Sequence, residues 1–354
     1  MAQLQFSNVG IRALAACVPA TVSKNEDALR DVVPADEIEK TIHAIGIREK
    51  RIASADTCAS DLCFAAAEKL FADNPEISRE SIDVLLFMSQ TFDFRTPATA
   101  AILQHRLGLS KNCAAMDLSL ACSGYVYALS TAFAYASNPG VKRVLLLDGE
   151  TYSKVVNPRD RVNAPLYGDA GTATLIEKSE DFESSYFVLK TDGSGENAVK
   201  IPAGGCRVPA TPETLSEKTA PDGSIRSDCE VFMNGMDVFN FAVRCAPDAV
   251  KDVAAISGIS PASADCVVFH QANKMMTDFL AARMKIPAEK VLYSLNKYGN
   301  TSSASIPLTI SECGEKLSSR ERVLLCGFGA GLSWAAATLS LASAKISPVV
   351  DYKS

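Results

Sequence analysis

The order of strand-like and helix-like segments occurs twice along this 354-residue chain. Apolar, β-branched segments alternate with helical patterns, and they lie at 82–90, 113–119, 143–150 and 171–179, then again at 265–271, 290–296 and 322–329. Asp83 corresponds to Asp265 and Arg143 to Arg322, at offsets of 182 and 179 residues. A steady offset near 180 residues predicts an α/β fold built from two related halves, 1–180 and 181–354. The alternative is coincidence among generic α/β strands.

The repeat predicts which residues come together. "CAAMDLSLAC" at 113–122 aligns with "VLYSLNKYGN" at 291–300, which places Cys122 opposite Asn300 at an offset of 178 residues. Equivalent strand ends of two pseudo-symmetric halves face one another, so both side chains are expected to approach one point. His270 ends the segment at 265–271 and is expected to join them, since reactive side chains gather at the carboxyl ends of strands in α/β proteins. The predicted site lies where the halves meet.

Cys122 stands where a strand-like segment turns through Ser-Gly into a helical one. At a helix N-terminus, unpaired N–H groups and the helix dipole stabilise a thiolate, which is the nucleophilic form of cysteine. The alternative is a buried cysteine that acts as a small apolar residue. The alternative for His270 is a hydrogen-bonded core histidine, and the alternative for Asn300 is a turn-forming asparagine. The match to Cys122 across the repeat favours a catalytic role for Asn300.

A glycine-rich segment, "GFGAGLSW" at 327–334, follows the last strand-like segment. Its spacing resembles part of a dinucleotide-binding fingerprint, but the chain ends before an acidic residue could close such a unit. A glycine turn that offers backbone N–H groups to an oxyanion agrees better with a Cys/His/Asn site.

Composition excludes several classes of protein. The net charge of −6 argues against a nucleic-acid binder. Eleven cysteines without a CxxC pair predict reduced, cytoplasmic thiols, and three scattered histidines argue against a metal centre. Residues 324–344 carry no charge over a membrane-spanning length, but they are rich in Gly, Ala, Ser and Thr, which favours a buried turn with flanking elements. We expect a soluble protein with no membrane segment.

The motifs "ACSG", "HQAN", "GNTSSAS" and "GFGAGLSW", in that order, resemble the thiolase superfamily, and most closely β-ketoacyl-acyl-carrier-protein synthase III. The similarity runs along nearly the full chain. It implies a five-layered αβαβα fold of two duplicated halves, and a homodimer. It also implies a cytoplasmic condensing enzyme of fatty acid, specialised lipid or polyketide initiation that needs no metal or redox cofactor.

The resemblance implies a role for each motif residue. Cys122 would carry an acyl primer as a thioester, and His270 and Asn300 would donate hydrogen bonds to the malonyl thioester as it loses carbon dioxide. The backbone N–H groups of Cys122 and Ala330 would form the second oxyanion hole. The malonyl group would arrive on an acyl carrier protein.

Several positions depart from the family pattern. Thr96 replaces a phenylalanine that walls the primer pocket, which leaves room for a longer or branched chain. The segment "EIEKTIHAIG" lacks the tryptophan that stacks on coenzyme A, and Met275 replaces an arginine. A carrier-bound primer is therefore favoured over acyl-coenzyme A. The expected substrate or carrier contacts are Thr96, Arg161, Phe239, Lys274, Arg283 and Lys285.

Two other functions stay open. A related enzyme would move the acyl group from Cys122 to an alcohol or amine without decarboxylation. An inactive subunit of a heterodimeric condensing system is the third, although the presence of all three catalytic residue types argues against it.

Overall fold

The computed structural model describes residues 2–317 and 320–353, and it contains two large mixed sheets. The seven-stranded sheet has the order β17 (Lys345–Ile346), β2 (Val9–Pro19), β8 (Ala170–Lys178), β7 (Arg143–Glu150), β5 (Val84–Met88) and β6 (Ala114–Leu118), with β18 (Val350–Tyr352) also paired to β2. The five-stranded sheet has the order β1 (Ala2–Phe6), β9 (Ser185–Thr191), β16 (Ser333–Leu339), β15 (Val323–Gly329) and β14 (Cys266–Phe269).

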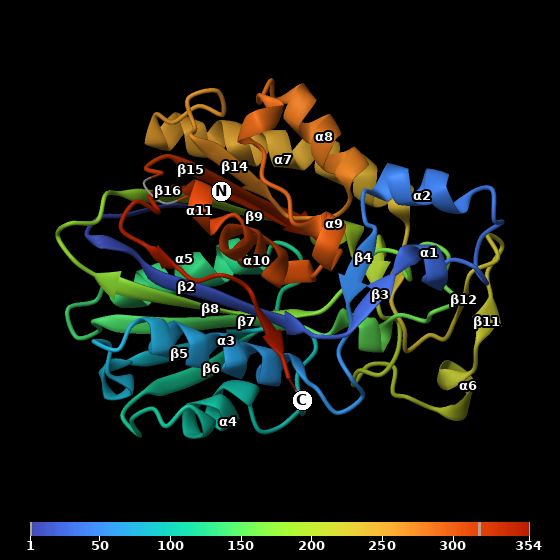
Figure 1. The fold of residues 1–354 in the computed structure, drawn as a ribbon, viewed down its shortest axis with the longest axis horizontal. Helices are drawn as coiled ribbons and strands as arrows, with labels where there is room; N and C mark the ends of the chain where they lie inside the picture. Colours follow the sequence, from blue (N-terminus) through green and yellow to red (C-terminus); the bar gives the residue numbers. More distant parts are fainter. Residues whose placement is uncertain (1, 318–319, 354) are drawn as a thin grey trace.

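The two sheets and three helical layers stack as αβαβα (Figure 1). Helices α5 (Gly124–Ala136) and α10 (Ser305–Glu312) lie between the sheets and share one apolar core with both. Helices α3 (Ala59–Asp73) and α4 (Thr99–Arg106) cover the outer face of the larger sheet, and α7 (Gly235–Ser257) and α8 (Lys274–Arg283) cover that of the smaller sheet. The expected five-layered architecture is confirmed.

The chain termini cross between the sheets. Strand β1 pairs antiparallel with β9 in the second sheet, whereas β17 and β18, from the end of the chain, pair parallel with β2 in the first. Each sheet therefore takes an edge strand from the other end of the sequence. The division at residue 180 stays a prediction.

The segment expected as a strand at 290–296 differs in the structure. It forms a single parallel bridge between Val291 and Val267, and a short helix, α9 (Leu295–Tyr298), begins soon afterwards. Its counterpart in the first half, β6, pairs along five residues of β5. The turn into α9 ends the extended backbone early and places Gly299 and Asn300 beside the central layer.

Smaller elements form a cap at one side of the stack (Figure 1). They comprise the helices α1 (Asn25–Ala28), α2 (Ile38–Ile45) and α6 (Pro212–Leu215) and three short two-stranded antiparallel sheets. These sheets pair β3 (Val22–Lys24) with β4 (Glu49–Arg51), β10 (Val199–Lys200) with β13 (Phe232–Met233), and β11 (Lys218–Thr219) with β12 (Ile225–Arg226). Over the described residues, no helix combines the length and the apolar character needed to span a membrane.

Candidate active site

Cys122 lies in the turn between β6 and α5, two residues before the helix begins at Gly124. The side chain is partly buried, and its sulfur lies 4.0 Å from the Ser302 hydroxyl. The backbone N–H groups of Cys122 and Ala330 lie close enough to this sulfur to lower the pKa of the thiol. A thioester carbonyl bonded to this sulfur would therefore place its oxygen near two backbone N–H donors when that oxygen becomes an oxyanion.

Gly329 allows this close approach between β15 and the nucleophile. A Cβ atom at position 329 would lie 2.9 Å from the Cys122 sulfur and 2.6 Å from its Cβ, distances that real structures do not tolerate. The glycine-rich segment after β15 thus brings the backbone of Ala330 against Cys122, as an oxyanion turn must.

Burial raises the pKa of the Cys122 thiol to about 12. The Ser302 hydroxyl and the two N–H groups lower this pKa, and the Glu150 carboxyl raises it, but burial dominates. The donors beside the sulfur favour the thiolate, as the position before α5 predicts, whereas burial opposes it. The side chain rests as a neutral thiol because desolvation outweighs the donors around it.

His270 follows β14 directly and is 2% exposed. Its Nδ1 lies 2.8 Å from the Ser305 hydroxyl, and the ring also hydrogen-bonds to the Ser302 backbone. Phe328 packs edge-on against it, with ring centroids 5.7 Å apart. Burial lowers the pKa of His270 to about 3, so the imidazole is neutral at physiological pH.

Asn300 follows Gly299 in the loop after α9. Its N–H donates to the Leu166 carbonyl at 2.8 Å, and its side-chain Oδ1 accepts from the Ser302 N–H at 2.9 Å. Because Oδ1 is engaged, the donor end of the amide, Nδ2, is the end that can meet a substrate oxygen. Gly299 has φ +70°, and a Cβ there would lie 2.7 Å from the Leu166 carbonyl oxygen, so only glycine fits this turn.

Ser302 joins the three residues that the repeat predicted to meet. Its hydroxyl contacts the Cys122 sulfur, its N–H binds Asn300, and its backbone binds His270. Ser302 has φ +51°, an uncommon backbone conformation for a residue other than glycine. Ser302 is not among the residues predicted from the sequence, because a serine within "GNTSSAS" has no pattern that distinguishes it from its neighbours.

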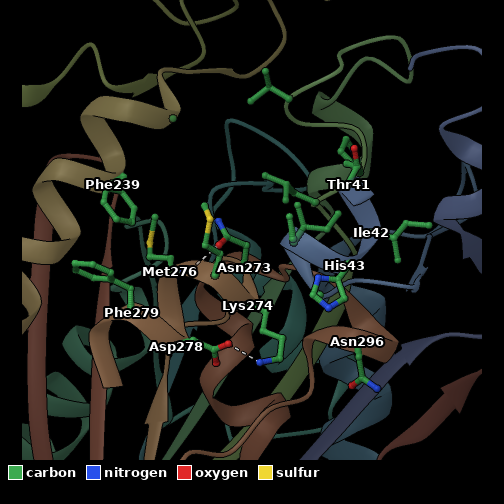
Figure 2. A pocket seen from close by; sticks show the side chains of 18 of the residues that line it. Thr41, Ile42, His43, Phe239, Asn273, Lys274, Met276, Asp278, Phe279 and Asn296 are labelled. Atoms are coloured by element: carbon green, nitrogen blue, oxygen red, sulfur yellow. Dashed lines mark hydrogen bonds and ion pairs between the residues drawn. The ribbon is translucent and has the colours of Figure 1, made fainter. Parts of the chain in front are cut away.

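A cleft of about 1310 Å³ opens beside the site and contains Arg161, Phe239 and Lys274 among its lining residues. In Figure 2, Phe239 and Phe279 lie at one side of the cleft and Ile42 and His43, from α2, at the other. The two phenylalanine rings are in edge contact, with centroids 5.3 Å apart. The lining of the cleft is mainly apolar, which suits a long, flexible thioester arm rather than a polar ligand.

The remaining predicted contacts lie elsewhere. Thr96 is in the exposed loop after β5, Arg283 ends α8, and Lys285 follows that helix; none of these three lines the cleft. Lys274 lies in the cleft, but its Nζ is 2.5 Å from Asp278. Lys274, Arg283 and Lys285 are three of the expected substrate or carrier contacts, and the carboxylate of Asp278 already neutralises the charge of Lys274. Asn273 of "HQAN" accepts from the Met276 N–H and caps α8, which positions the Lys274 side of the cleft.

A second cavity, of about 490 Å³, adjoins the nucleophile. Ala121 and Ala330, the neighbours of Cys122 in sequence and in space, line it together with Tyr152, Gln90 and Thr91. The smaller cavity thus adjoins the residues on either side of the sulfur and can hold an acyl group next to Cys122.

All eleven cysteines are unpaired. Within the described residues, no group of three or more His, Cys, Asp or Glu side chains is placed to hold a metal ion.

Comparisons with known proteins agree with this geometry. Residues 116–193 match the family model for 3-oxoacyl-[acyl-carrier-protein] synthase III, and residues 254–341 match the model for its C-terminal part. A β-ketoacyl-[acyl-carrier-protein] synthase III from Rhodopirellula baltica is 35% identical over 94% of this chain and 98% of its own length. The corresponding enzyme from Symbiobacterium thermophilum is 37% identical over 95% of this chain and 99% of its own length.

A solved structure supports the same conclusion. The 3-oxoacyl-(acyl-carrier protein) synthase from Burkholderia xenovorans superimposes with a TM-score of 0.92 at 36% identity, covering 99% of both chains. The chain therefore belongs to the β-ketoacyl-acyl-carrier-protein synthase III family of condensing acyltransferases.

Proposed function

We propose that this protein condenses an acyl primer, held as a thioester on Cys122, with a malonyl group carried by an acyl carrier protein, and so initiates a fatty acid, specialised lipid or polyketide chain. The observation that carries the proposal is the assembly around Ser302. It combines a thiol with two backbone donors, a neutral imidazole and an amide whose donor end is free for substrate.

In the first half-reaction, the Cys122 sulfur attacks the primer thioester carbonyl. The oxygen becomes an oxyanion and accepts hydrogen bonds from the N–H groups of Cys122 and Ala330. Collapse breaks the bond to the leaving thiol, which takes the proton that Cys122 gives up. The sulfur attacks as the thiolate, so burial of the thiol opposes this step, and the Ser302 hydroxyl and the backbone N–H groups beside the sulfur favour it.

In the second half-reaction, the malonyl carboxylate leaves as carbon dioxide, and its bonding electron pair moves into an enolate. His270 and Asn300 donate to the enolate oxygen. Because His270 is neutral, it stabilises the enolate by donating a hydrogen bond and does not transfer its proton to the enolate oxygen. The new carbanion carbon then attacks the acyl carbonyl, and the Cys122 sulfur leaves and regains one proton from solvent.

We further propose that the chain acts as a homodimer in the cytoplasm. Among the described strands, β6 pairs only with β5 and so ends its sheet, and the loop at 90–98 exposes Phe92 and Phe94, 37% and 60% respectively. A second copy that extends the sheet would cover these surfaces. Eleven unpaired cysteines agree with a reducing compartment.

The test is intact-protein mass after incubation with a panel of acyl-carrier and acyl-coenzyme A thioesters, followed by malonyl-carrier. We expect an acyl adduct on the wild type and none on Cys122→Ala. Malonyl-carrier should discharge the adduct with release of carbon dioxide and a product two carbons longer. An adduct that only an alcohol or amine discharges would support the non-decarboxylating acyltransferase instead, and no adduct from any donor would support the inactive subunit.

A further inference from the structure

Two carboxyl side chains lie buried at the end of β7, where the catalytic steps above do not use them. Asp148 and Glu150 alternate along the strand, so they point to the same face as Val144 and Leu146, toward the central helical layer. Both are fully buried. An apolar strand face thus ends in two acids directly beneath the catalytic loops.

No cation compensates these carboxyls among the described groups that interact with them. The titratable side chains that respond to their charge are Cys63 from α3, Tyr125 from α5, and Cys122, Tyr152 and Tyr167 around the site. The pKa of each of these groups is raised, so all are neutral. Keeping both Asp148 and Glu150 ionised while they are buried beside each other without a cation would cost free energy, so burial favours their protonated forms.

Ser303 bridges the two acids. Its hydroxyl donates to Asp148 Oδ1 at 2.5 Å and lies 3.3 Å from Glu150 Oε1. A protonated Glu150 can donate to the Ser303 oxygen while Ser303 donates to Asp148, so that the three groups form one directed chain. Ser303 directly follows Ser302, the residue that contacts Cys122, His270 and Asn300.

Glu150 also holds a second segment. Its Oε1 accepts from the Gln90 N–H at 3.0 Å, and its Oε2 accepts from the Thr91 hydroxyl at 2.8 Å. Gln90 and Thr91 line the smaller cavity beside Cys122. One carboxyl group therefore connects the loop that bears Asn300 with the wall of the chamber next to the nucleophile.

We propose that Asp148 and Glu150 form a protonated carboxyl pair that acts, through Ser303, as a positioning unit for the Asn300–Ser302 loop. The unit serves the condensation proposed above and rests on that function for its catalytic consequence. Burial raises the pKa of Glu150 to about 8 and that of Asp148 well above its usual range, which agrees with a neutral pair below pH 8. Above that pH, an ionised Glu150 opposes loss of the Cys122 proton.

The first test does not depend on the substrate. The rate of iodoacetamide alkylation of Cys122, followed by mass of its peptide, is measured from pH 6 to pH 10 in the wild type and in Glu150→Gln. The amide mimics the protonated acid, since Nε2 can donate to Ser303 while the amide oxygen, in the place of Glu150 Oε2, accepts from Thr91 and from the Gln90 N–H, which lies 3.2 Å from Oε2 in the wild type. We expect equal rates near pH 6.5 and a several-fold faster rate for the variant at pH 9. A rate ratio that is constant across this range would overturn the proton-bearing role.

The second test measures the catalytic consequence. Ser303→Ala removes the bridge, and Ser303→Thr keeps a hydroxyl. We expect Ser303→Ala to lower the kcat of condensation at least tenfold, with a smaller effect on acylation of Cys122, and Ser303→Thr to restore part of the loss. Ser311→Ala, at a buried serine of α10 that binds the Ser347 carbonyl, is the control and should leave both rates unchanged.

The outcomes separate this proposal from the proposed function. If wild-type protein releases no carbon dioxide from malonyl-carrier, the condensation fails, while the alkylation profiles still decide the state of the pair. If condensation proceeds but Ser303→Ala equals the wild type, the positioning unit is wrong. Circular dichroism of each variant identifies any loss of folding, and Glu150→Gln, a nearly isosteric change, remains informative if Ser303→Ala unfolds.

Discussion

Burial favours the uncharged forms of His270, which is 2% exposed, and of Cys122, which is partly buried. This neutrality suits a reaction in which negative charge appears only briefly on substrate oxygens. Fixed neutral donors stabilise that charge when it forms and need no reorganisation.

The neutral state of His270 predicts a dependence of stability on acid. Its folded pKa of about 3 lies below the ordinary value of 6.5, so the unfolded chain binds a proton first as pH falls. Stability that His270 contributes above pH 6.5 is therefore lost as pH falls toward 3, by about 2–3 kcal/mol between pH 6.5 and 4.5. Urea denaturation at both pH values should show this loss in the wild type and less of it in His270→Gln. Equal losses in the two proteins would contradict the prediction.

Asn300 predicts a split between the two half-reactions. Asn300→Asp replaces the donor with an acceptor that carries charge, so decarboxylation should slow by about 10²- to 10³-fold, the usual effect of one lost oxyanion donor. Acylation of Cys122 uses other donors and should fall by less than about tenfold on the same grounds. Carbon dioxide release and adduct mass, followed in the same samples, check this split. Equal loss of both steps would show instead that the substitution disrupts the loop as a whole.

At the scale of elements, the end of β15 sets the distance between the oxyanion turn and the nucleophile. A side chain at Gly329 would collide with the sulfur and Cβ of Cys122, which are held by the start of α5. The contact between a strand of one half and the helix turn of the other is thus part of the site itself.

Gly329→Ala is expected to displace Cys122 from the N–H groups that surround its sulfur. Acylation should slow by at least about tenfold, since a shift of about 1 Å in a reacting group has effects of this order or larger. The rate of adduct formation from an acyl thioester is the measurement. Gly140→Ala, at a position with no atom within 4 Å of the new Cβ, is the matched control and should react at the wild-type rate. A normal rate in Gly329→Ala would mean that the turn can move aside without loss.

At the scale of the whole molecule, the two sheets share the core that contains α5 and α10, so the two halves are not separate bodies joined by a linker. Within the described residues, β6 forms an edge of the larger sheet, and the loop at 90–98 beyond β5 exposes Phe92 and Phe94.

Phe94→Asp tests whether a second copy covers this surface. A charge at a buried contact is unfavourable, so the variant should sediment with the mass of one chain, whereas the wild type should have the mass of two. Val22→Asp, which changes an exposed apolar residue of β3, should remain dimeric. A wild-type protein that sediments as one chain would refute the dimer, and a dimeric Phe94→Asp would place the interface elsewhere.

Local patterns in the sequence carried most of the architecture. The periodicity of apolar residues predicted β5, β7, β8, β14 and β15 to within a few residues, because strand and helix spacing is a short-range property. The 180-residue repeat placed Cys122 opposite Asn300, and the structure links both to Ser302. The prediction of a strand at 290–296 was wrong, because the β propensity of these residues does not indicate the turn into α9.

By itself, then, the sequence determined the α/β class through short-range periodicity, the family and its layered fold through motif order, and the pairing of Cys122 with Asn300 through the 180-residue repeat. Only the tertiary structure decided the crossing of β1, β17 and β18 between the sheets, the neutral state of Cys122, and the link from Ser303 to Asp148 and Glu150. These features depend on burial and on contacts between residues more than 100 positions apart, and no local pattern encodes how much water reaches a side chain once the chain has folded.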